Sequence, residues 1–395
     1  IGLEAEITLA AAGDGRLCAA LLCYDVDCGA YADSAPYMAK AIAVDCTGPY
    51  GVENLFCQTR CVYTNHTFAT SYRGFGHAEF TFCLERTMDV LAQKLHLDPL
   101  AFRLHLPACL EKLRQGGWRG NMVHEVKPHT VRAQGVACFW KSENPPLNAA
   151  SGALVTCNPD GSFNLMTGVV EMGSAAKTQL AQILAEALKI DAGRVHVVSD
   201  VDTRQHPVHW KTVASMSVYM AGNAVLRAAE DILSQIKRNA ALAFACPEDE
   251  IEAADGRVYW KKEPARGLSY KELTAGYLSA EGQTLGEPVL GRGGFLLHGL
   301  SDLNRATGQG QPGPSWTVGA QGVEVEVDTR TYTYRILRAE TALDVGCALN
   351  PSVLRAVVAG GMAMGLSMAS REAYRYDGAG RLATPTLRTY KVMHL

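Results

Sequence analysis

Alternating apolar and polar positions predict three β-hairpins of similar build along the chain. Each hairpin runs into an acid-x-Gly sequence and then into a loop or a helical stretch. We interpret this recurrence as a weak internal repeat, with chance recurrence of hairpins as the alternative. The hairpins span residues 3–28, 154–170 and 323–343, and the acid-x-Gly sequences are Asp27-Cys-Gly29, Glu171-Met-Gly173 and Asp344-Val-Gly346.

Apolar residues at helical spacing predict helices between and after the hairpins. Asp98-Pro99 is a typical helix start, and Ser174 is expected to cap a helix that ends at Leu188. Gly291-Arg-Gly-Gly294 is expected to form a turn. The predicted helices span 30–44, 78–95, 98–113, 218–244 and 268–278, a glycine-rich helix opening is expected at 358–365, and strands are expected at 135–140 and 195–199.

The chain has 395 residues, and this length is typical of two or three domains. Pro145-Pro146 lies in an irregular stretch and marks a candidate boundary. We therefore expect a first domain at 1–145 and a second at 146–395, with a less regular insert at about 245–318. The elements indicate an α+β fold, with mixed sheets and packed helices in two similar domains.

Composition narrows the class of protein. A net charge of −3 gives no reason to expect nucleic acid or an anionic membrane as a partner. No apolar run approaches about 18 residues, so we expect no transmembrane span. The chain begins with Ile1 and has no signal-peptide pattern, which suggests a processed chain or a piece of a longer one.

Twelve cysteines are present, but none forms a CxxC pair, and no compact set has the spacing of a zinc or iron–sulfur site. We expect reduced thiols in a cytoplasmic protein and assign no metal ligands, with a metal cluster as the alternative.

The stretch Thr70–Glu79 is the first candidate for chemistry. Gly74 and Gly76 bracket Phe75, so the backbone here can approach a ligand closely while the ring offers a face to a planar substrate. Arg73 is a permanent cation that can hold an oxyanion or anchor the loop. An ordinary turn between a strand and a helix is the alternative.

Two serine-containing helix starts form the second candidate. At a helix start, free backbone N–H groups and the helix dipole create an anion site. One start includes Met172, Gly173 and Ser174, and the other includes Ala214, Ser215, Met216 and Ser217. If the two starts lie near one another, they could hold the two phosphates of a pyrophosphate; ordinary capped helices are the alternative.

Several motifs together resemble the molybdenum-binding subunit of the xanthine dehydrogenase and aldehyde oxidase family. The resemblance covers nearly the whole chain, and the motifs occur in the family's order. They are Tyr72-Arg-Gly-Phe-Gly76, Glu85–Ala92, Leu97–Arg103, Glu171–Thr178 (family E-M-G-Q-G-x-x-T), Lys211–Ser217 (family G-T-A-A-S-R-S) and Asp344–Pro351 (family D-x-G-x-x-x-N-P).

The resemblance implies an oxidoreductase that hydroxylates an aldehyde or an N-heterocycle at a molybdopterin centre. Phe75 would stack on the substrate, while the loop at Arg73, Gly74 and Gly76 would lie beside the metal. Residues 172–174 and 214–217 would hold the cofactor, which is commonly a cytosine dinucleotide in bacteria. The 2Fe-2S cluster and FAD would lie on partner chains, an iron–sulfur subunit and a flavin subunit.

The chain departs from the family at several positions. Ser174 and Ala175 replace the family's glutamine and glycine, and Ala356-Val357 replaces a second glutamine. The family's basic glutamate lies in a G-x-G-E segment, which this sequence does not contain. Glu79, Glu171 and Glu372 have suitable chemistry but do not match that place, so we assign no catalytic residue.

Three hypotheses follow from the sequence. In the first, the chain is part of a molybdenum hydroxylase, and the remaining part of the subunit completes its active site. The second is a degenerate, non-catalytic family member that serves as a structural or assembly subunit, motivated by Ser174, Ala175 and Val357. The third is an unrelated module whose two helix starts bind a nucleotide.

Overall fold

A computed structural model describes residues 2–103, 107–120 and 122–393, and it has the α+β fold that the sequence predicts. The chain forms two compact units: unit 1 comprises residues 1–142 and 312–395, and unit 2 comprises 143–311. The expected boundary at 145 thus lies close to residue 142, where the chain first leaves unit 1 and enters unit 2. Residues 312–395, which the sequence places in the second domain, belong to unit 1 because β15 pairs with β5 along its whole length.

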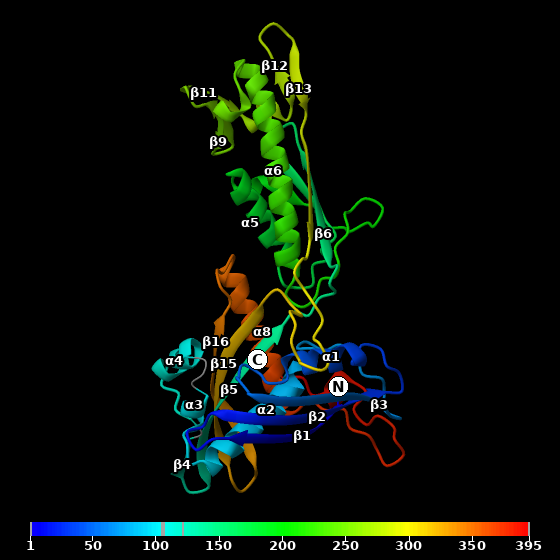
Figure 1. Cartoon of the computed structure of the whole chain (residues 1–395), viewed down its shortest axis with the longest axis vertical. Helices are drawn as coiled ribbons and strands as arrows, with labels where there is room; N and C mark the ends of the chain where they lie inside the picture. The colour runs from blue at the N-terminus through cyan, green and yellow to red at the C-terminus, as the bar shows by residue number, and fades with distance from the viewer. Residues whose placement is uncertain (1, 104–106, 121, 394–395) are drawn as a thin grey trace. The chain divides into compact units, whose positions relative to one another are not determined.

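Unit 1 contains two sheets with helix α2 packed between them (Figure 1). The first sheet has the order β1-β2-β3, in which β2 and β3 are parallel and α1 forms the connection. The second is antiparallel with the order β16-β15-β5-β4. The elements are β1 Gly2–Ala11, β2 Leu17–Gly29, α1 Ala35–Asp45, β3 Asn54–Tyr63, α2 His77–Lys94, β4 Val123–Lys127, β5 Thr130–Ser142, β15 Trp316–Asp328 and β16 Thr333–Asp344.

Helix α2 has two apolar faces, and each face packs against one of the two sheets. Phe80 packs into the cluster formed by β2 and α1, while Leu84 and Met88 pack into the cluster that contains Trp118 and Val136. The predicted helix at 98–113 is divided into α3 (Pro99–Phe102) and α4 (Pro107–Gln115), and residues 104–106 of that prediction lie outside the described residues.

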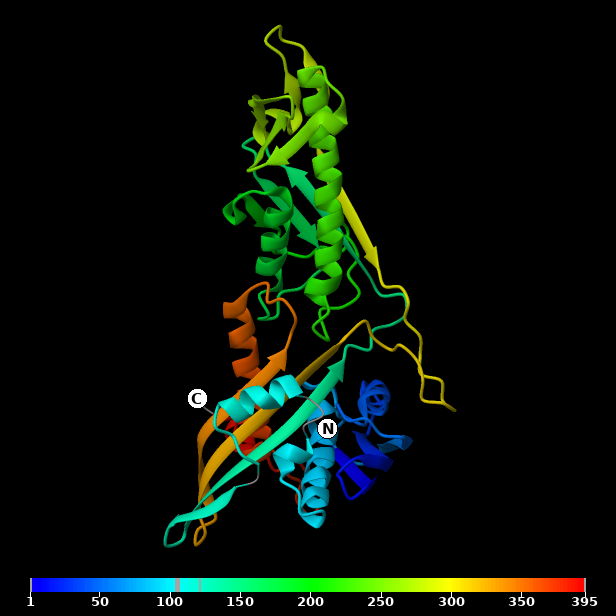
Figure 2. The ribbon, with the colours of Figure 1, turned by 60° about the vertical axis from the view of Figure 1, so that its left-hand side comes forward.

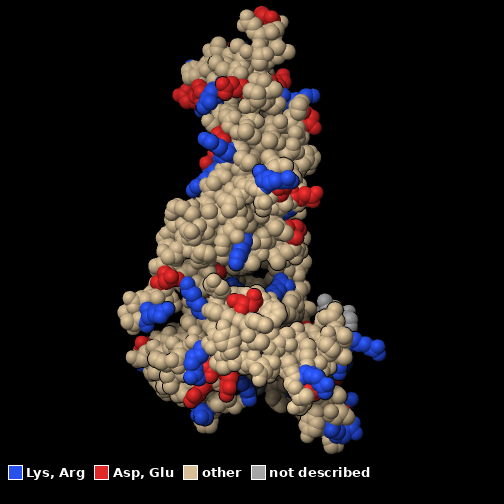
Figure 3. Space-filling view, turned by 90° about the vertical axis from the view of Figure 1, so that its right-hand side faces the viewer, with Lys and Arg blue, Asp and Glu red and all other residues tan. Residues whose placement is uncertain are grey.

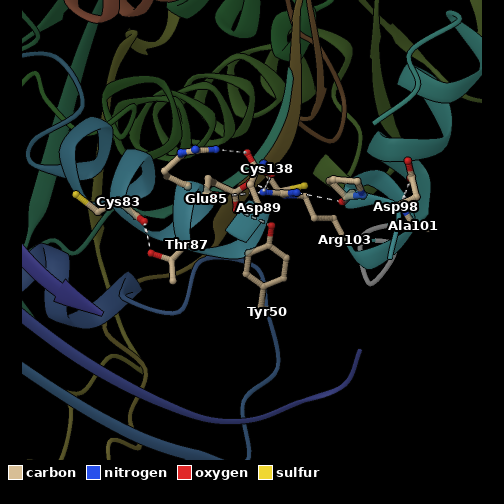
Figure 4. A network of polar contacts seen from close by, with 11 residues as sticks. Tyr50, Cys83, Glu85, Thr87, Asp89, Asp98, Ala101, Arg103 and Cys138 are labelled. Carbon is tan, nitrogen blue, oxygen red and sulfur yellow. Dashed lines mark hydrogen bonds and ion pairs between the residues drawn. The ribbon is translucent and has the colours of Figure 1, made fainter. Parts of the chain in front are cut away.

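A buried ionic network fixes α2 against β5 (Figure 4). The Glu85 carboxylate accepts hydrogen bonds from Arg103 Nε (2.7 Å), Tyr50 Oη (2.5 Å) and the backbone N–H of Cys138 (2.9 Å). Arg103 also pairs with Asp89 at 2.8 Å. Because the donors satisfy the buried carboxylate, the network tolerates burial of both charges and sets the position of α2.

Unit 2 is built on a sheet of order β14-β6-β7-β8, and α5 and α6 cover one face of it (Figure 2). Gly222 of α6 lies so close to α5 that a Cβ there would be 3.0 Å from Ile183 Cδ1. Glycine therefore allows the close packing of the two helices. The elements are β6 Ala150–Cys157, β7 Phe163–Thr167, α5 Ala176–Leu188, β8 Val195–Val197, α6 Ser217–Phe244 and β14 Leu290–Leu296.

The insert of unit 2 contains small sheets, and two predictions for it are wrong. Residues 268–278 do not form one helix; they include the end of a strand, the short helix α7 and a further strand. Gly291–Gly294 does not form a turn but lies within β14. The elements of the insert are the 3-10 helix η2 Glu248–Glu250, then β9 Ile251–Ala254, β10 Arg257–Trp260, β11 Glu263–Ser269, α7 Tyr270–Leu273, β12 Ala275–Leu278 and β13 Thr284–Pro288; a further 3-10 helix, η1 Ala192–Arg194, lies between α5 and β8.

The three hairpins share a hydrogen-bond pattern at their ends, whereas the internal repeat stays a prediction with chance recurrence of hairpins as its alternative. All three predicted hairpins are present, as β1–β2, β6–β7 and β15–β16. In each acid-x-Gly sequence the carboxylate accepts the N–H of the glycine two residues later. The distances are 2.8 Å from Asp27 to Gly29, 2.9 Å from Glu171 to Gly173 and 3.1 Å from Asp344 to Gly346. The three glycines have φ of 67°, 98° and 61°, a left-handed conformation that favours glycine.

Two further helices lie near the chain's end, α8 (Pro351–Ser370) and α9 (Leu387–Tyr390). The segment 358–365 lies inside α8 rather than at its start. Contrary to the expectation from apolar runs, α8 is long and apolar enough to cross a membrane, by length and composition alone. On the face shown in Figure 3, basic and acidic side chains are interspersed, in keeping with the small net charge.

The glycines of β14 provide a test of the helix–sheet packing in unit 2. A Cβ on Gly293 would lie 2.0 Å from the carbonyl oxygen of Ala224, whereas a Cβ on Gly294 would meet nothing within 4 Å. We expect Gly293→Ala to lower the free energy of unfolding by about 1–3 kcal/mol or more, because the helix must move away from the strand.

Gly294→Ala is the matched control and should stay within about 0.5 kcal/mol of the wild type. Chemical denaturation of both variants measures the difference. Equal stabilities would mean that α6 does not approach β14 at Gly293.

Candidate functional site

The connection from β3 to α2 carries the first candidate site, and the end of β2 fixes its beginning. The Asp27 carboxylate accepts a hydrogen bond from Thr64 Oγ1 at 2.6 Å and lies 2.6 Å from His66 Nδ1. Burial raises the pKa of Asp27, but the hydrogen bonds from Thr64, His66 and the Gly29 N–H outweigh it, so the pKa is lowered. Asp27 therefore remains a carboxylate that holds this connection.

Three consecutive residues of this connection have a left-handed backbone: Gly74 (φ 111°), Phe75 (φ 55°) and Gly76 (φ 86°). The conformation is unfavourable for Phe75, whose Cβ makes it strained. The half-buried Phe75 side chain packs against the β2–α1 cluster. Strain of this kind persists only where surrounding contacts impose it, and it is often found at functional sites.

Arg73 anchors the loop to helix α8. Its guanidinium donates to the carbonyl oxygen of Val357 (Nη2, 2.9 Å) and lies 3.6 Å from Met364 Sδ. A Cβ on Gly360 would lie 3.3 Å from Arg73 Nη1, so a glycine leaves room for the guanidinium. Of the two roles that the sequence allows for Arg73, the structure shows the anchor. A permanent cation beside the middle of α8 is also more typical of a globular protein than of a membrane span.

The segment after α8 lies along the same connection. Tyr376 stacks on His66, with ring centroids 4.5 Å apart, and its hydroxyl accepts the N–H of Thr67. The hydroxyl of Tyr72, next to Arg73, is hydrogen-bonded to the Glu372 carboxylate; burial first and then this carboxylate raise the pKa of Tyr72. Glu372, a candidate base on its chemistry, is also hydrogen-bonded to Tyr390, so it holds two tyrosine side chains.

The second candidate site lies in unit 2, where the connections that lead into the two predicted helix starts are hydrogen-bonded to each other. The N–H of Val170, before the α5 start, donates to Thr212 Oγ1 at 3.0 Å, and Thr212 precedes the α6 start. The segments 172–174 and 214–217 both belong to unit 2, whereas Arg73, Gly74, Phe75 and Gly76 belong to unit 1.

The α5 start is filled by a side chain of the protein itself. The Glu171 carboxylate accepts hydrogen bonds from the backbone N–H groups of Gly173 and Ala175 (both 2.9 Å), Met172 (3.1 Å) and Lys177 (3.3 Å). Burial raises the pKa of Glu171, but these N–H groups outweigh it and the pKa is lowered. The expectation that Ser174 caps α5 is wrong, because the N-cap position is Ala175, with φ of 52°.

The α6 start has a different build. Ala214 and Ser215 both have positive φ, 55° and 59°, and no side chain caps the helix among the described residues. The Met216 side chain is buried against Met220 and Leu297, so it belongs to the core. A 28-residue helix directs the positive end of its dipole to this point. The α6 start therefore fits an anionic group such as a phosphate, whereas the α5 start already holds a carboxylate.

Metal ligands are not gathered in the described residues: these contain no group of three or more His, Cys, Asp or Glu that could hold a metal ion. All twelve cysteines lie in the described part of the chain and are free thiols.

Two family models match the chain. Both are described as molybdopterin cofactor-binding domains, and they match residues 2–105 and 111–395. The chain belongs to the molybdopterin cofactor-binding domain family. The matched ranges include both candidate sites.

Curated relatives of this family member include components of xanthine dehydrogenases. The chain is 27% identical to a probable xanthine dehydrogenase subunit of Bacillus subtilis, over 94% of this chain and 51% of that protein. It is 28% identical to the xanthine dehydrogenase molybdenum-binding subunit of Escherichia coli, over 85% of this chain and 46% of that protein. The chain thus spans about half the length of the curated relatives it matches.

Solved structures show the same fold. CO dehydrogenase from Oligotropha carboxidovorans matches with a TM-score of 0.83 at 21% identity, covering 99% of this chain and 52% of that one. The aldehyde oxidoreductase from Desulfovibrio desulfuricans matches with a TM-score of 0.80 at 23% identity, covering 99% and 41%. The α+β architecture of this chain is therefore that of these two enzymes.

The sequence did not indicate two residues that support the unit 1 site. His77 and Asp45 form a buried pair, with 2.6 Å between His77 Nε2 and Asp45 Oδ2. His77 lies in the stretch Thr70–Glu79, but Asp45 is 32 residues away from it in the sequence, so no local pattern connects the two. The position of His77 directly after Gly76 was the signal that could have drawn attention to it.

Glu171 provides a pH-dependent test of the α5 start. Its folded pKa lies below the ordinary value of 4.5, so its stabilising contribution is present above that value and is lost as the pH falls through the folded pKa. We expect Glu171→Gln to destabilise the chain by about 1 kcal/mol at pH 7, since one amide cannot accept from all these N–H groups.

The stability difference between wild type and Glu171→Gln should shrink below pH 4.5, where the protonated carboxyl resembles the amide. Thermal unfolding from pH 3 to pH 8 measures it. Glu186→Gln, on an exposed part of α5, is the control. A difference that does not change with pH would contradict the role of the Glu171 charge.

Proposed function

We propose that this chain forms the molybdopterin-binding part of a molybdenum hydroxylase that oxidises an aldehyde or an N-heterocycle. The observation that carries the proposal is the α6 start, where two successive left-handed residues precede a long helix beside the α5 loop in a molybdopterin-binding family member. When bound, the molybdopterin group supplies the two-electron redox chemistry of hydroxylation with oxygen from water. The residues of this chain would bind the cofactor and orient the substrate beside it.

In this proposal the backbone of Ala214, Ser215, Met216 and Ser217 holds a phosphate of the cofactor. Free N–H groups at a helix start bind an anion without bringing a counter-charge. Met172, Gly173 and Ser174 approach the same group from the α5 side, with Glu171 holding their loop. Because a Cβ on Gly173 would meet nothing within 4 Å, the loop leaves open space on that side.

Phe75 would bind the substrate. Its neighbours Gly74 and Gly76 expose the backbone to close approach, and Arg73 fixes the loop to α8 rather than meeting the substrate. Part of the Phe75 side chain is packed, and the rest remains accessible for an aromatic or planar carbonyl compound. Proteins similar to this chain include a quinoline 2-oxidoreductase and an aldehyde oxidase, and these activities support the proposed substrate class.

The proposed partners follow from the chain's coverage of its relatives. The basic glutamate would come from the remaining part of the molybdenum subunit. An iron–sulfur subunit and a flavin subunit would carry the electrons away; relatives named as subunits of dehydrogenases support a multi-subunit complex. The free thiols support a cytoplasmic location. We propose the cytosine dinucleotide form of the cofactor.

A non-catalytic scaffold of the same family is the second candidate. It is favoured by the filled α5 start, where Glu171 occupies the N–H groups and Ala175 replaces glycine at a left-handed position. A scaffold would keep the fold and lose the cofactor.

The cofactor content of the native complex separates these candidates. We expect near-stoichiometric molybdenum, and release of CMP on acid hydrolysis, when the protein is purified from its own host with its co-purifying partners. Metal analysis and nucleotide chromatography measure both. A complete native complex with neither molybdenum nor nucleotide would support the scaffold instead.

Substitution of Phe75 tests its role in the active complex. If the ring stacks on substrate, Phe75→Ala should raise KM about 2- to 10-fold and leave kcat less affected, since stacking contributes about 0.5–1.5 kcal/mol. Steady-state kinetics with an aldehyde and an N-heterocycle measure both constants. Phe82→Ala removes an exposed ring (70% exposed) from α2 and should change neither. An unchanged KM in Phe75→Ala would remove the stacking role.

A further inference from the structure

His77, the first residue of α2, uses both nitrogens of its ring. Nδ1 lies 2.8 Å from the carbonyl oxygen of Gly74, and Nε2 lies 2.6 Å from Asp45 Oδ2. A carbonyl oxygen only accepts, so Nδ1 must donate to Gly74. The carboxylate also accepts, so the ring connects two acceptors through two N–H groups. The side chains are nearly completely buried, with 9% of His77 and none of Asp45 exposed.

Asp45 is held in place by the second sheet of unit 1. Its carboxylate accepts hydrogen bonds from the N–H and the hydroxyl of Ser142 (both 2.9 Å) and from Trp316 Nε1 (3.1 Å). Its carbonyl oxygen accepts from Trp140 Nε1 at 3.0 Å. Strands β5 and β15 therefore fix Asp45, and Asp45 fixes the His77 ring.

The ring in turn constrains the strained loop. The Gly74 carbonyl accepts from both the ring Nδ1 and the backbone N–H of His77 (3.1 Å), so the orientation of the Gly74–Phe75 peptide is determined twice. On the other side, a Cβ on Gly76 would lie 3.0 Å from Ile42, so α1 limits the loop as well. Phe75 is the residue that bears the strain of this conformation, since it is left-handed without being glycine.

We propose that His77 is a positioning residue, which, held by Asp45, fixes Gly74-Phe75-Gly76 in the conformation that presents Phe75 to the substrate. The relation to substrate rests on the proposed function, whereas the constraint on the loop stands on the contacts of this chain alone. The two can therefore be tested separately.

Two amide substitutions separate the two hydrogen bonds of the ring. His77→Asn places an N–H donor near the position of Nδ1 and keeps the bond to Gly74, but it loses Asp45. His77→Gln places a donor near Nε2 and keeps the bond to Asp45, but it loses Gly74. If His77 only filled space or supported the core, the two variants would not show opposite effects on the loop and on stability.

Amide hydrogen exchange and thermal unfolding of the purified chain provide the first readout. In His77→Gln we expect the amides of residues 75–80 to exchange roughly tenfold faster, with a nearly unchanged Tm. In His77→Asn we expect loop exchange close to the wild type, with a Tm lower by about 5 °C because the buried Asp45 loses a partner. Met88→Ala, in a separate core cluster of α2, is the control for destabilisation alone.

Kinetics of the native complex provide the second readout. His77→Gln should raise KM more than it lowers kcat, and the effect should disappear in a Phe75→Ala background, because His77 acts through Phe75. His77→Asn should restore KM toward the wild type despite its lower Tm.

The outcomes separate the inference from the proposed function. If both amides, like Met88→Ala, speed loop exchange only in proportion to their loss of Tm, or if neither changes exchange, the positioning role is overturned. If exchange behaves as expected but the wild-type complex turns over no aldehyde or N-heterocycle, the proposed function fails while the constraint on the loop stands.

Discussion

Each of the three hairpins ends at the same hydrogen bond. In it, a carboxylate accepts the N–H of a glycine two residues later, and that glycine has a left-handed backbone. Asp27, Glu171 and Asp344 all make this bond. The turn fixes the direction in which the chain leaves the sheet, because the carboxylate and the positive φ together determine the following peptide. The three carboxylates differ in their further hydrogen-bond partners. These partners determine which segment each carboxylate holds in place.

Asp27 uses its remaining hydrogen bonds to hold Thr64 and His66 at the beginning of the Phe75 connection. Asp344 leads to α8, whose Val357 carbonyl accepts from Arg73. The loop is thus held from the end of β2, from α8, and, through His77 and Asp45, from β5 and β15. A strained residue such as Phe75 needs this many independent supports, since any single hydrogen bond contributes less than the strain can cost.

The sequence predicted what local patterns determine. Alternation and turn residues located the hairpins, helical spacing located α2, α5 and α6, and the pattern of Gly74-Phe75-Gly76 indicated an unusual backbone. It could not predict contacts between distant segments. Gly291–Gly294 has the composition of a turn, but Gly291 and Gly293 lie in a strand that α6 approaches too closely for a side chain. The return of 312–395 to unit 1 depends on pairing of β15 with β5, and the Asp45–His77 pair joins two helices without a motif.

Glu171 shows why the two helix starts of unit 2 are not equivalent. It is one methylene longer than the aspartates of the other repeats, and its carboxylate reaches beyond Gly173 to the N–H groups of Ala175 and Lys177. This chain has alanine at position 175, where the family has glycine. Ala175 has φ of 52°, a left-handed conformation that is unfavourable for alanine, and the α5 start with its bound Glu171 carboxylate forms despite this cost. A phosphate that competed for these N–H groups would have to displace a bound carboxylate. At α6 the left-handed pair Ala214 and Ser215 precedes a longer helix with no such side chain in the described residues, so in the proposed function the anionic charge of the cofactor is held at α6, and Glu171 shapes the loop beside it.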